Sequence, residues 1–277
     1  MTSPAAWSED LLAQARRALV VGRELCACDG YYHALWPSLR VAGITDSLPF
    51  EEPVLASLMS PFIRDGARIM VAGAADPGFL CVMGRIHGAH RPRFTVLDRC
   101  GAGLELVREF AEARGHALRI RKGDLLDLDD SEQHDQIVMH YILDFVPPQF
   151  RKRFLANLAR ALTKGGVLVS CGMTAAKIAG ARDRELENVF LNYGLETLRN
   201  SPLAEETQGA EFERMMRGYA AAWGTRRLHK VTDEEQRALL AGAGFEVISE
   251  TVVPRPRRSV AGATIVDTRT IVVATKR

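Results

Sequence analysis

Short apolar runs alternate with amphipathic stretches between residue 66 and about residue 172. The apolar runs have the length of buried strands, and the stretches between them place apolar residues every three to four positions, as amphipathic helices do. Strands that alternate with helices require a parallel sheet with right-handed crossovers. The predicted strands are 68–72, 93–97, 117–121, 135–140 and 166–171, and the predicted helices are 77–87, 101–114 and 148–162.

Two regions depart from this alternation. Residues 1–65 begin with a helical pattern that includes Leu11, Ala15 and Leu19, and prolines then divide the segment into short pieces. Residues 173–230 hold two long helical patterns, 182–198 and 211–223. We therefore predict an N-terminal helical region over 1–65 that covers the active site, and a main domain over 66–277. A helical cap, residues 173–230, is inserted in that domain.

The last two predicted strands indicate how the sheet ends. Helix 232–242 leads into strand 245–252, and 12 residues without a helical pattern separate that strand from strand 265–274. A parallel crossover normally requires a helix, so an antiparallel pair is expected. The predicted fold class is α/β and Rossmann-like, with a mostly parallel seven-stranded sheet and an antiparallel terminal strand.

Composition narrows the classes of partner. The chain has 277 residues, of which 47% are hydrophobic and 25% charged, and its net charge is +2. Such a balanced charge does not steer a protein to nucleic acid or membrane, and no apolar run approaches the roughly 18 residues of a membrane span. An odd count of five cysteines and the lack of a secretory pattern favour reduced thiols and a cytoplasmic setting.

The turn after the first predicted strand has features of a nucleotide-binding turn. Gly73, Ala74 and Ala75 carry almost no side chain, so the backbone can approach a ligand closely. About 20 residues later, the next strand ends in Asp98, whose carboxylate is placed to accept hydrogen bonds from ribose hydroxyls. The second glycine of the dinucleotide motif is Ala75 here, and Gly78 comes five residues after Gly73. This spacing favours a nucleoside ligand without a pyrophosphate over NAD or FAD.

With this turn, four further segments in the same order resemble the class I S-adenosylmethionine-dependent methyltransferases. The resemblance covers roughly residues 66–172 and 231–277, and the reversed terminal strand also distinguishes this family from nicotinamide-binding folds. The segments are Gly123-Asp124-Leu125, Asp135-Gln-Ile-Val-Met-His-Tyr-Ile-Leu-Asp-Phe145, Phe154-Leu-Ala-Asn-Leu-Ala-Arg-Ala-Leu-Thr-Lys-Gly-Gly-Val-Leu-Val169 and Leu239-Leu-Ala-Gly-Ala-Gly-Phe-Glu-Val247.

The resemblance implies that S-adenosylmethionine is the cofactor and S-adenosylhomocysteine the product. It places Asp98 on the ribose, the Asp124 carboxylate on the adenine amino group and the backbone N–H of Leu125 on the adenine ring. Asp76 is expected to cap the following helix, to contact the cofactor, or to do both. Arg99 either lies along the adenosine or stays on the surface.

His140 closes the fourth predicted strand, where a parallel sheet meets its ligands. Three interpretations stay open: a packed histidine bonded to a backbone group, a contact with the methionine part of the cofactor, or a catalytic base. Asp144 would orient the imidazole if the turn after the strand is helical. A base is useful for a phenol or alcohol acceptor and dispensable for a neutral amine.

Aromatic and sulfur-containing side chains outside the cofactor motifs are candidates for the substrate pocket. Plain packing is the competing interpretation for each of them. They are Tyr31 and Tyr32 in the N-terminal region and Met216, Tyr219 and Trp223 in the predicted cap.

No metal site is expected. Cys26-Ala-Cys28 with His33 has the spacing C-x-C-x4-H, but a second clear pair of ligands is missing from the neighbouring sequence.

The sequence thus predicts a methyltransferase that acts on a small molecule, by O- or N-methylation, in bacterial secondary metabolism. The alternative is a protein of this fold that binds the cofactor but catalyses a non-methylating reaction or serves as a partner subunit. The expected partner is a small-molecule acceptor, without nucleic acid or membrane. The acceptor, the methylated atom and assembly as a homodimer stay open.

Overall fold

The computed structural model describes residues 4–26, 28, 31–45, 48–173, 184–225, 231–258 and 264–277. Within these residues, seven strands form one sheet in the order β3-β2-β1-β4-β5-β7-β6, and β7 runs antiparallel to both of its neighbours. The predicted fold class is confirmed. The strands are β1 (Arg68–Ala72), β2 (Arg93–Asp98), β3 (Ala117–Lys122), β4 (His134–His140), β5 (Leu162–Met173), β6 (Phe245–Arg258) and β7 (Thr264–Lys276).

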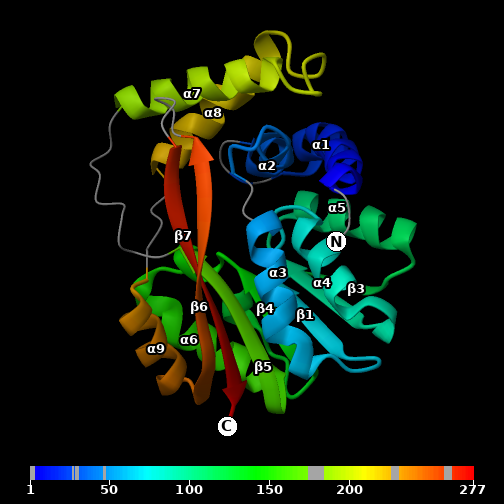
Figure 1. Ribbon diagram of the computed structural model, residues 1–277, viewed down its shortest axis with the longest axis vertical. Helices are drawn as coiled ribbons and strands as arrows, with labels where there is room; N and C mark the ends of the chain where they lie inside the picture. Colours follow the sequence, from blue (N-terminus) through cyan, green and yellow to red (C-terminus); the bar gives the residue numbers. More distant parts are fainter. Residues whose placement is uncertain are drawn as a thin grey trace.

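The terminal strands are longer than predicted. β5 pairs with β7 as far as Met173 and Arg269, but β6 and β7 continue to pair up to Arg258 and Thr264. The connection between them is correspondingly shorter than the predicted loop. Beyond the end of β5 the two strands form a hairpin arm that rises towards the cap (Figure 1).

Helices cover both faces of the sheet. On one face lie α3 (Leu48–Met59), α4 (Gly78–His87) and α5 (Gly101–Arg114), with a buried cluster that contains Leu55, Leu80 and Val107. On the other face lie α6 (Arg151–Ala161) and α9 (Asp233–Gly242), with Phe154 and Leu240 in the buried cluster. Among the described helices, none combines the length and apolar character needed to cross a membrane.

Local signals explain where the elements begin and end. β1 is buried over its last four residues, as expected for a central parallel strand that helices cover on both sides. Thr232 caps α9 by accepting a hydrogen bond from the Glu235 N–H at 3.1 Å. α5 ends at Gly115, whose φ of 66° lies in the left-handed region that favours glycine. Short 3-10 turns follow β4 and precede α6, so that helix begins three residues later than predicted.

The remaining helices lie at the end of the molecule opposite the C-terminus: α1 (Pro4–Leu25), α2 (Tyr32–Val41), α7 (Arg184–Arg199) and α8 (Ala210–Thr225). Figure 1 shows α7 and α8 above α1 and α2. A third buried cluster joins the two pairs, with Leu35 and Leu39 from α2 against Leu195 and Met216 from the cap. Among the described residues, α7 and α8, the helices of the predicted cap, therefore pack on α1 and α2.

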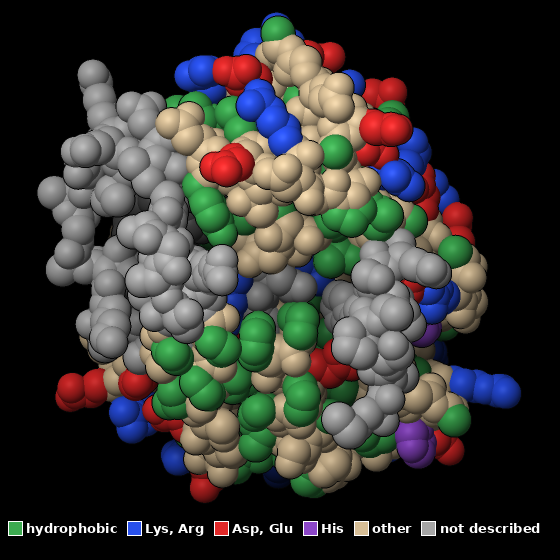
Figure 2. Space-filling model, turned by 45° about the horizontal axis from the view of Figure 1, so that its top comes forward, with side chains coloured by type: hydrophobic (Ala, Val, Ile, Leu, Met, Phe, Trp, Pro, Cys, Tyr) green, Lys and Arg blue, Asp and Glu red, His purple; other side chains and the backbone are tan. Residues whose placement is uncertain are grey.

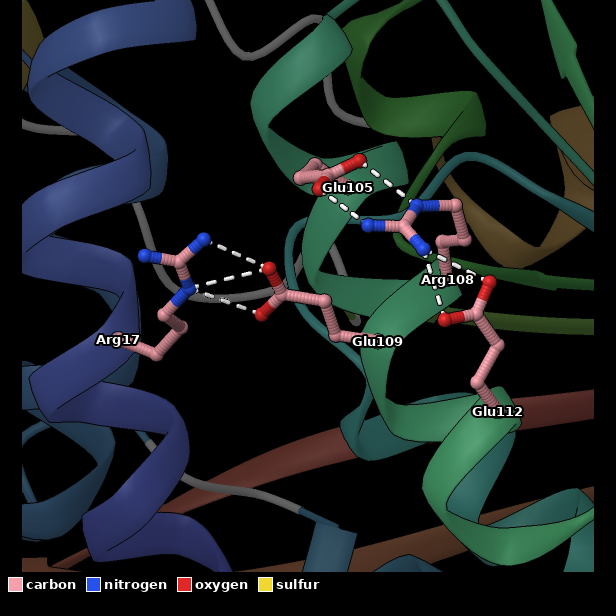
Figure 3. Close-up of polar contacts among 5 residues, drawn as sticks. All are labelled: Arg17, Glu105, Arg108, Glu109 and Glu112. Carbon is pink, nitrogen blue, oxygen red and sulfur yellow. Dashed lines mark hydrogen bonds and ion pairs between the residues drawn. The ribbon is translucent and has the colours of Figure 1, made fainter.

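Two kinds of ion pair fasten the N-terminal helices to the main domain. Arg17 of α1 and Glu109 of α5 form an exposed two-pronged contact with N–O distances of 2.7–3.1 Å (Figure 3). Arg40 of α2 instead pairs with Asp76 in the turn after β1, and its Nη1 lies 2.8 and 2.7 Å from the two carboxylate oxygens. The Arg40 and Asp76 side chains are only 2% and 5% exposed. Removing either partner would leave the other charge buried and unpaired, which is costly in free energy.

We predict that Asp76→Ala lowers the free energy of unfolding by about 3 kcal/mol, because the buried Arg40 guanidinium loses its carboxylate. The matched control is Arg17→Ala, which removes an exposed pair and should change that free energy by less than about 1 kcal/mol. Urea unfolding followed by circular dichroism measures both. Similar small changes in the two variants would show that burial does not distinguish the pairs.

Candidate functional site

The turn after β1 is shaped for close backbone approach. Gly73 has a φ of +82°, and its N–H donates to the Leu97 carbonyl at 2.8 Å. The positive φ favours glycine, and a Cβ at this position would lie 2.2 Å from Cδ1 of Ile142, so the Ile142 side chain would have to move. The ends of β1, β2 and β4 thus meet at one edge of the sheet.

Asp76 and Gly78 shape the start of α4. Oδ1 of Asp76 accepts a hydrogen bond from the Gly78 N–H at 2.6 Å, at the first residue of α4. The helix begins one residue later than predicted, so Pro77 is the N-cap residue and Asp76 precedes it. A Cβ on Gly78 would lie 2.2 Å from Nη1 of Arg40, so the missing side chain makes room for the guanidinium. A contact of Asp76 with the cofactor stays a prediction, and its carboxylate is already engaged by α2.

Asp98 joins two turns at the same edge. Its Oδ2 accepts from the Ala74 N–H at 2.8 Å, and its Oδ1 accepts from the Cys100 N–H at 2.7 Å. Burial raises the pKa of the Asp98 carboxyl, and the two N–H groups only partly offset this rise. The carboxylate is therefore held in a fixed position next to Gly73, where the predicted ribose contact would form.

The adenine side of the predicted site follows β3. Oδ1 of Asp124 accepts from the Leu126 N–H at 2.9 Å and begins the short 3-10 helix Leu125–Asp127. Leu125 is buried, and the Asn157 amide on α6 donates to its carbonyl oxygen at 3.2 Å. Arg99 is on the surface: its side chain is 80% exposed, and its Nε lies 3.7 Å from Oδ2 of Asp124. The adenine contacts of Asp124 and Leu125 stay predictions.

A buried carboxylate that the sequence analysis missed lies beside His140. Oε2 of Glu51, on α3, is 2.7 Å from His140 Nε2, and its Oε1 accepts a hydrogen bond from the Tyr141 hydroxyl at 2.5 Å. Glu51 is fully buried, and His140 keeps 15% of its side chain exposed. Phe79 stacks on the imidazole with ring centroids 4.9 Å apart. Glu51 therefore orients His140, and the predicted role of Asp144 beside the imidazole stays a prediction.

The environment keeps Glu51 ionised. Burial raises the pKa of its carboxyl, but the His140 imidazole, the Tyr141 hydroxyl and the Arg269 guanidinium together bring the pKa below its ordinary value. An ionised carboxylate only accepts, so His140 donates from Nε2 and keeps Nδ1 as its basic nitrogen. Tyr141 has a φ of 62°, a strained conformation for this residue type that occurs often at functional sites.

Three of the predicted substrate-pocket residues, Tyr32, Met216 and Tyr219, pack between the N-terminal helices and α7 and α8. Met216 and Tyr219 are buried, and the Tyr219 ring stacks on Tyr32 with centroids 6.3 Å apart and an interplanar angle of 6°. Tyr31 is 38% exposed and precedes α2 with a φ of 55°. The Trp223 side chain lies outside the described residues. Figure 2 shows the surface hollowed beneath the cap, with hydrophobic side chains below the hollow.

Four potential metal ligands gather next to Asp98. They are the side chains of Cys26, Cys28, His33 and Cys100, whose ligand atoms all lie within 4.8 Å of one another. The first three are the residues that the sequence analysis set aside, and the fourth comes from the turn after β2. The cluster is linked to the predicted cofactor site, because the Cys100 N–H donates a hydrogen bond to Asp98.

Comparison with known proteins agrees with this geometry. Residues 78–170 match the model of a methyltransferase domain family. Two similar curated proteins are carboxy-S-adenosyl-L-methionine synthases. The one from Wolinella succinogenes is 28% identical over 140 residues, which cover 47% of this chain and 58% of that protein. The one from Campylobacter curvus is 29% identical over 157 residues, which cover 54% and 58%. The chain spans little more than half the length of these relatives.

Solved structures show the same fold. The [4+2]-cyclase SpnF has 14% sequence identity and a TM-score of 0.57, with 94% of this chain and 96% of that chain covered. A methyltransferase from Methanosarcina mazei that depends on S-adenosylmethionine has 17% identity and a TM-score of 0.52, with 79% and 96% covered.

The sheet order, the reversed β7 and the turn after β1 define a class I Rossmann-like fold of the methyltransferase type. Residues 78–170 carry the match to a methyltransferase domain, and the fold around them is shared with an S-adenosylmethionine-dependent enzyme. Both findings support S-adenosylmethionine as the cofactor expected at this sheet edge.

We predict that Asp98→Ala weakens S-adenosylmethionine binding by about 2 kcal/mol or more, because charge-assisted hydrogen bonds to the ribose are lost. Isothermal titration calorimetry measures the change, with Asp129→Ala in the exposed loop after β3 as the control. Since the Asp98 pKa is raised, wild-type affinity should also fall with decreasing pH, and earlier than for an ordinary aspartate. Unchanged affinity in Asp98→Ala would place the cofactor elsewhere.

The stacked pair of Tyr32 and Tyr219 should couple the cap to α2. A double-mutant cycle with Tyr32→Ala and Tyr219→Ala should give a coupling of about 0.5–1.5 kcal/mol in the free energy of unfolding. Cofactor affinity should change little in either variant, because neither ring belongs to the sheet edge. Additive effects in the cycle would show that the two rings act independently.

Proposed function

We propose that the protein transfers the methyl group of S-adenosylmethionine to a hydroxyl of a small molecule held beneath the cap. The observation that carries the proposal is the pairing of Glu51 with His140 at the carboxyl end of β4. This pair stands one strand away from the turn at Gly73, in the part of the fold where cofactor and acceptor would meet.

The chain's own residues suit this chemistry. S-adenosylmethionine, when bound, supplies an activated methyl group on a positively charged sulfur. A hydroxyl acceptor must lose its proton as the methyl group is transferred, and Nδ1 of His140 is the group that takes it. Glu51 fixes the imidazole tautomer through Nε2 and stabilises the imidazolium that forms, as a carboxylate does beside a catalytic histidine. The backbone at Gly73 and the Asp98 carboxylate position the cofactor so that the reacting atoms align.

The expected size and setting of the acceptor follow from the rest of the chain. The cap rests on α1 and α2 at the carboxyl end of the sheet, an arrangement that suits an enclosed small molecule. The net charge of +2 is too small to attract a nucleic acid by a long-range electrostatic field. A role in bacterial secondary metabolism is part of the proposal. A fold neighbour from echinomycin biosynthesis, with 14% identity and a TM-score of 0.51, is in keeping with it.

A second candidate function is a reaction that uses S-adenosylmethionine without methylating an acceptor. The curated relatives favour it, because their names describe synthesis of carboxy-S-adenosyl-L-methionine. Under this alternative, His140 and Glu51 would bind or activate a co-substrate next to the cofactor. The two functions differ in what becomes of the cofactor, and mass spectrometry separates them.

The test is to incubate the protein with S-adenosylmethionine and a panel of phenols, alcohols and amines. Methyl transfer releases S-adenosylhomocysteine together with a methylated acceptor. With a hydroxyl acceptor, His140→Ala and Glu51→Gln should each lower turnover by about two orders of magnitude or more. Raising the pH should partly rescue His140→Ala, because hydroxide then removes the proton. The exposed His90→Ala is the control and should keep wild-type turnover.

Other outcomes would redirect the proposal. Loss of cofactor affinity in His140→Ala with unchanged turnover at saturation would make His140 a contact of the methionine part. Full activity in His140→Ala would exclude the base role and favour a nitrogen acceptor. In a parallel incubation with a carboxylic acid that can give up its carboxyl group, a carboxylated cofactor formed without S-adenosylhomocysteine would establish the second candidate.

A further inference from the structure

The cluster of Cys26, Cys28, His33 and Cys100 is assembled from three separate parts of the chain. The first two cysteines follow α1, His33 lies in the first turn of α2, and Cys100 directly precedes α5. His33 and Cys100 are 4% and 3% exposed, and the other two are half-buried. The sequence spacing hides this site, because Cys100 is 74 residues away from Cys26.

The distances between donor atoms suit a tetrahedral metal ion. Cys26 Sγ lies 3.3 Å from His33 Nδ1 and 3.9 Å from Cys100 Sγ. With Zn–S bonds of about 2.3 Å and a Zn–N bond of about 2.0 Å, tetrahedral angles separate two sulfurs by about 3.8 Å and a sulfur from a nitrogen by about 3.5 Å. The sulfurs are too far apart for a disulfide, which needs about 2.05 Å. All five cysteines of the chain are free thiols in the structure.

We propose that Cys26, Cys28, His33 and Cys100 bind one Zn²⁺ ion in a closed structural site. Three thiolates and one imidazole are a donor set that selects zinc over the hard ions magnesium and calcium. Four protein ligands leave no open position for a water or a substrate, so the ion stabilises the fold and does not take part in the chemistry.

The position of the site gives it a specific task. It ties the segment between α1 and α2 to the turn after β2, and the Cys100 N–H in that turn holds Asp98 Oδ1. A Cβ on Gly103 would lie 2.1 Å from the Ala74 carbonyl oxygen and 3.0 Å from Cδ2 of His33. The glycine therefore lets both the turn after β1 and the His33 ring pack against the first turn of α5. A zinc ion here would hold the N-terminal helices in place. Through the Cys100 backbone it would also hold Asp98, the predicted ribose contact.

The other contacts between α1 and α5 are weak, which makes the metal tie significant. Two exposed ion pairs join these helices, Arg17 with Glu109 (Figure 3) and Asp10 with Arg114, and their side chains are 31–48% accessible. Exposed pairs of this kind contribute little to stability. The described apolar contact sets Ala18 and Val21 of α1 against Ala102 and Leu106 of α5, with Cys100 in the same cluster. Among the described residues, a metal ion would therefore add the strongest tie between the end of α1 and the start of α5.

The first test measures metal in the full chain, purified without chelators. Plasma mass spectrometry should find about one zinc per chain. A mercurial thiol reagent should release the ion, detected with a metallochromic dye. Cys28→Ser and Cys100→Ser should each lose most of the zinc, whereas Cys81→Ser, at a buried cysteine outside the cluster, should retain it. Wild-type protein with less than about a tenth of an equivalent that also takes up no added Zn²⁺ would overturn the proposal.

A second measurement does not depend on variants that could fail to fold. Wild-type protein stripped by a chelator and reloaded with Co²⁺ should show the visible bands of a tetrahedral cobalt–thiolate site. Stripping should lower the melting temperature by several degrees, and added Zn²⁺ should restore it. Absence of these bands, or a metal-free protein with a disulfide between Cys26 and Cys100, would refute the zinc site. The disulfide would instead identify a redox-active cluster.

Discussion

The arrangement of the helices around the candidate site depends on the buried ion pair between Arg40 and Asp76. It joins α2 to the turn after β1, where the cofactor backbone contacts are expected. The cap in turn packs on α1 and α2. A buried charge that loses its partner is costly, so this pair specifies one position for α2 on the sheet edge. The glycine at position 78 is part of the same contact, because a side chain there would displace the guanidinium.

Two further polar contacts complete the edge, and both reach it from outside the parallel strands. Glu51 arrives on α3 and meets His140, and the loop between α1 and α2 brings Cys26 to Cys100. The sheet therefore supplies the general position of the site, whereas the helices that precede β1 supply groups that tune it. This division is consistent with a domain class in which a shared sheet edge binds the cofactor and added segments set the chemistry.

Much of the fold could be predicted from the sequence. The strands around Val71, Val96 and Val138 are mainly apolar at their centres because helices cover both faces of the sheet, and this pattern is local. The reversed β7 could also be predicted, since the connection before it is too short for a helix. The extent of β6 and β7 could not, because strands that pair only with each other beyond the sheet carry no distinct signal. Glu51 gave no signal either: it is one of two adjacent glutamates in a proline-punctuated segment.

The sequence by itself determined the order of the elements, the turn at Gly73 and the acids Asp98 and Asp124 at the strand ends. These features depend on residues within one strand–turn–helix unit, so local spacing is enough to identify them. Only the tertiary structure decided which distant side chains meet: Arg40 with Asp76, Glu51 with His140, and Cys100 with the cluster after α1. Such pairings depend on how the helices dock on the sheet. Helix docking is decided by the packing of the whole chain and leaves no fixed spacing in the sequence.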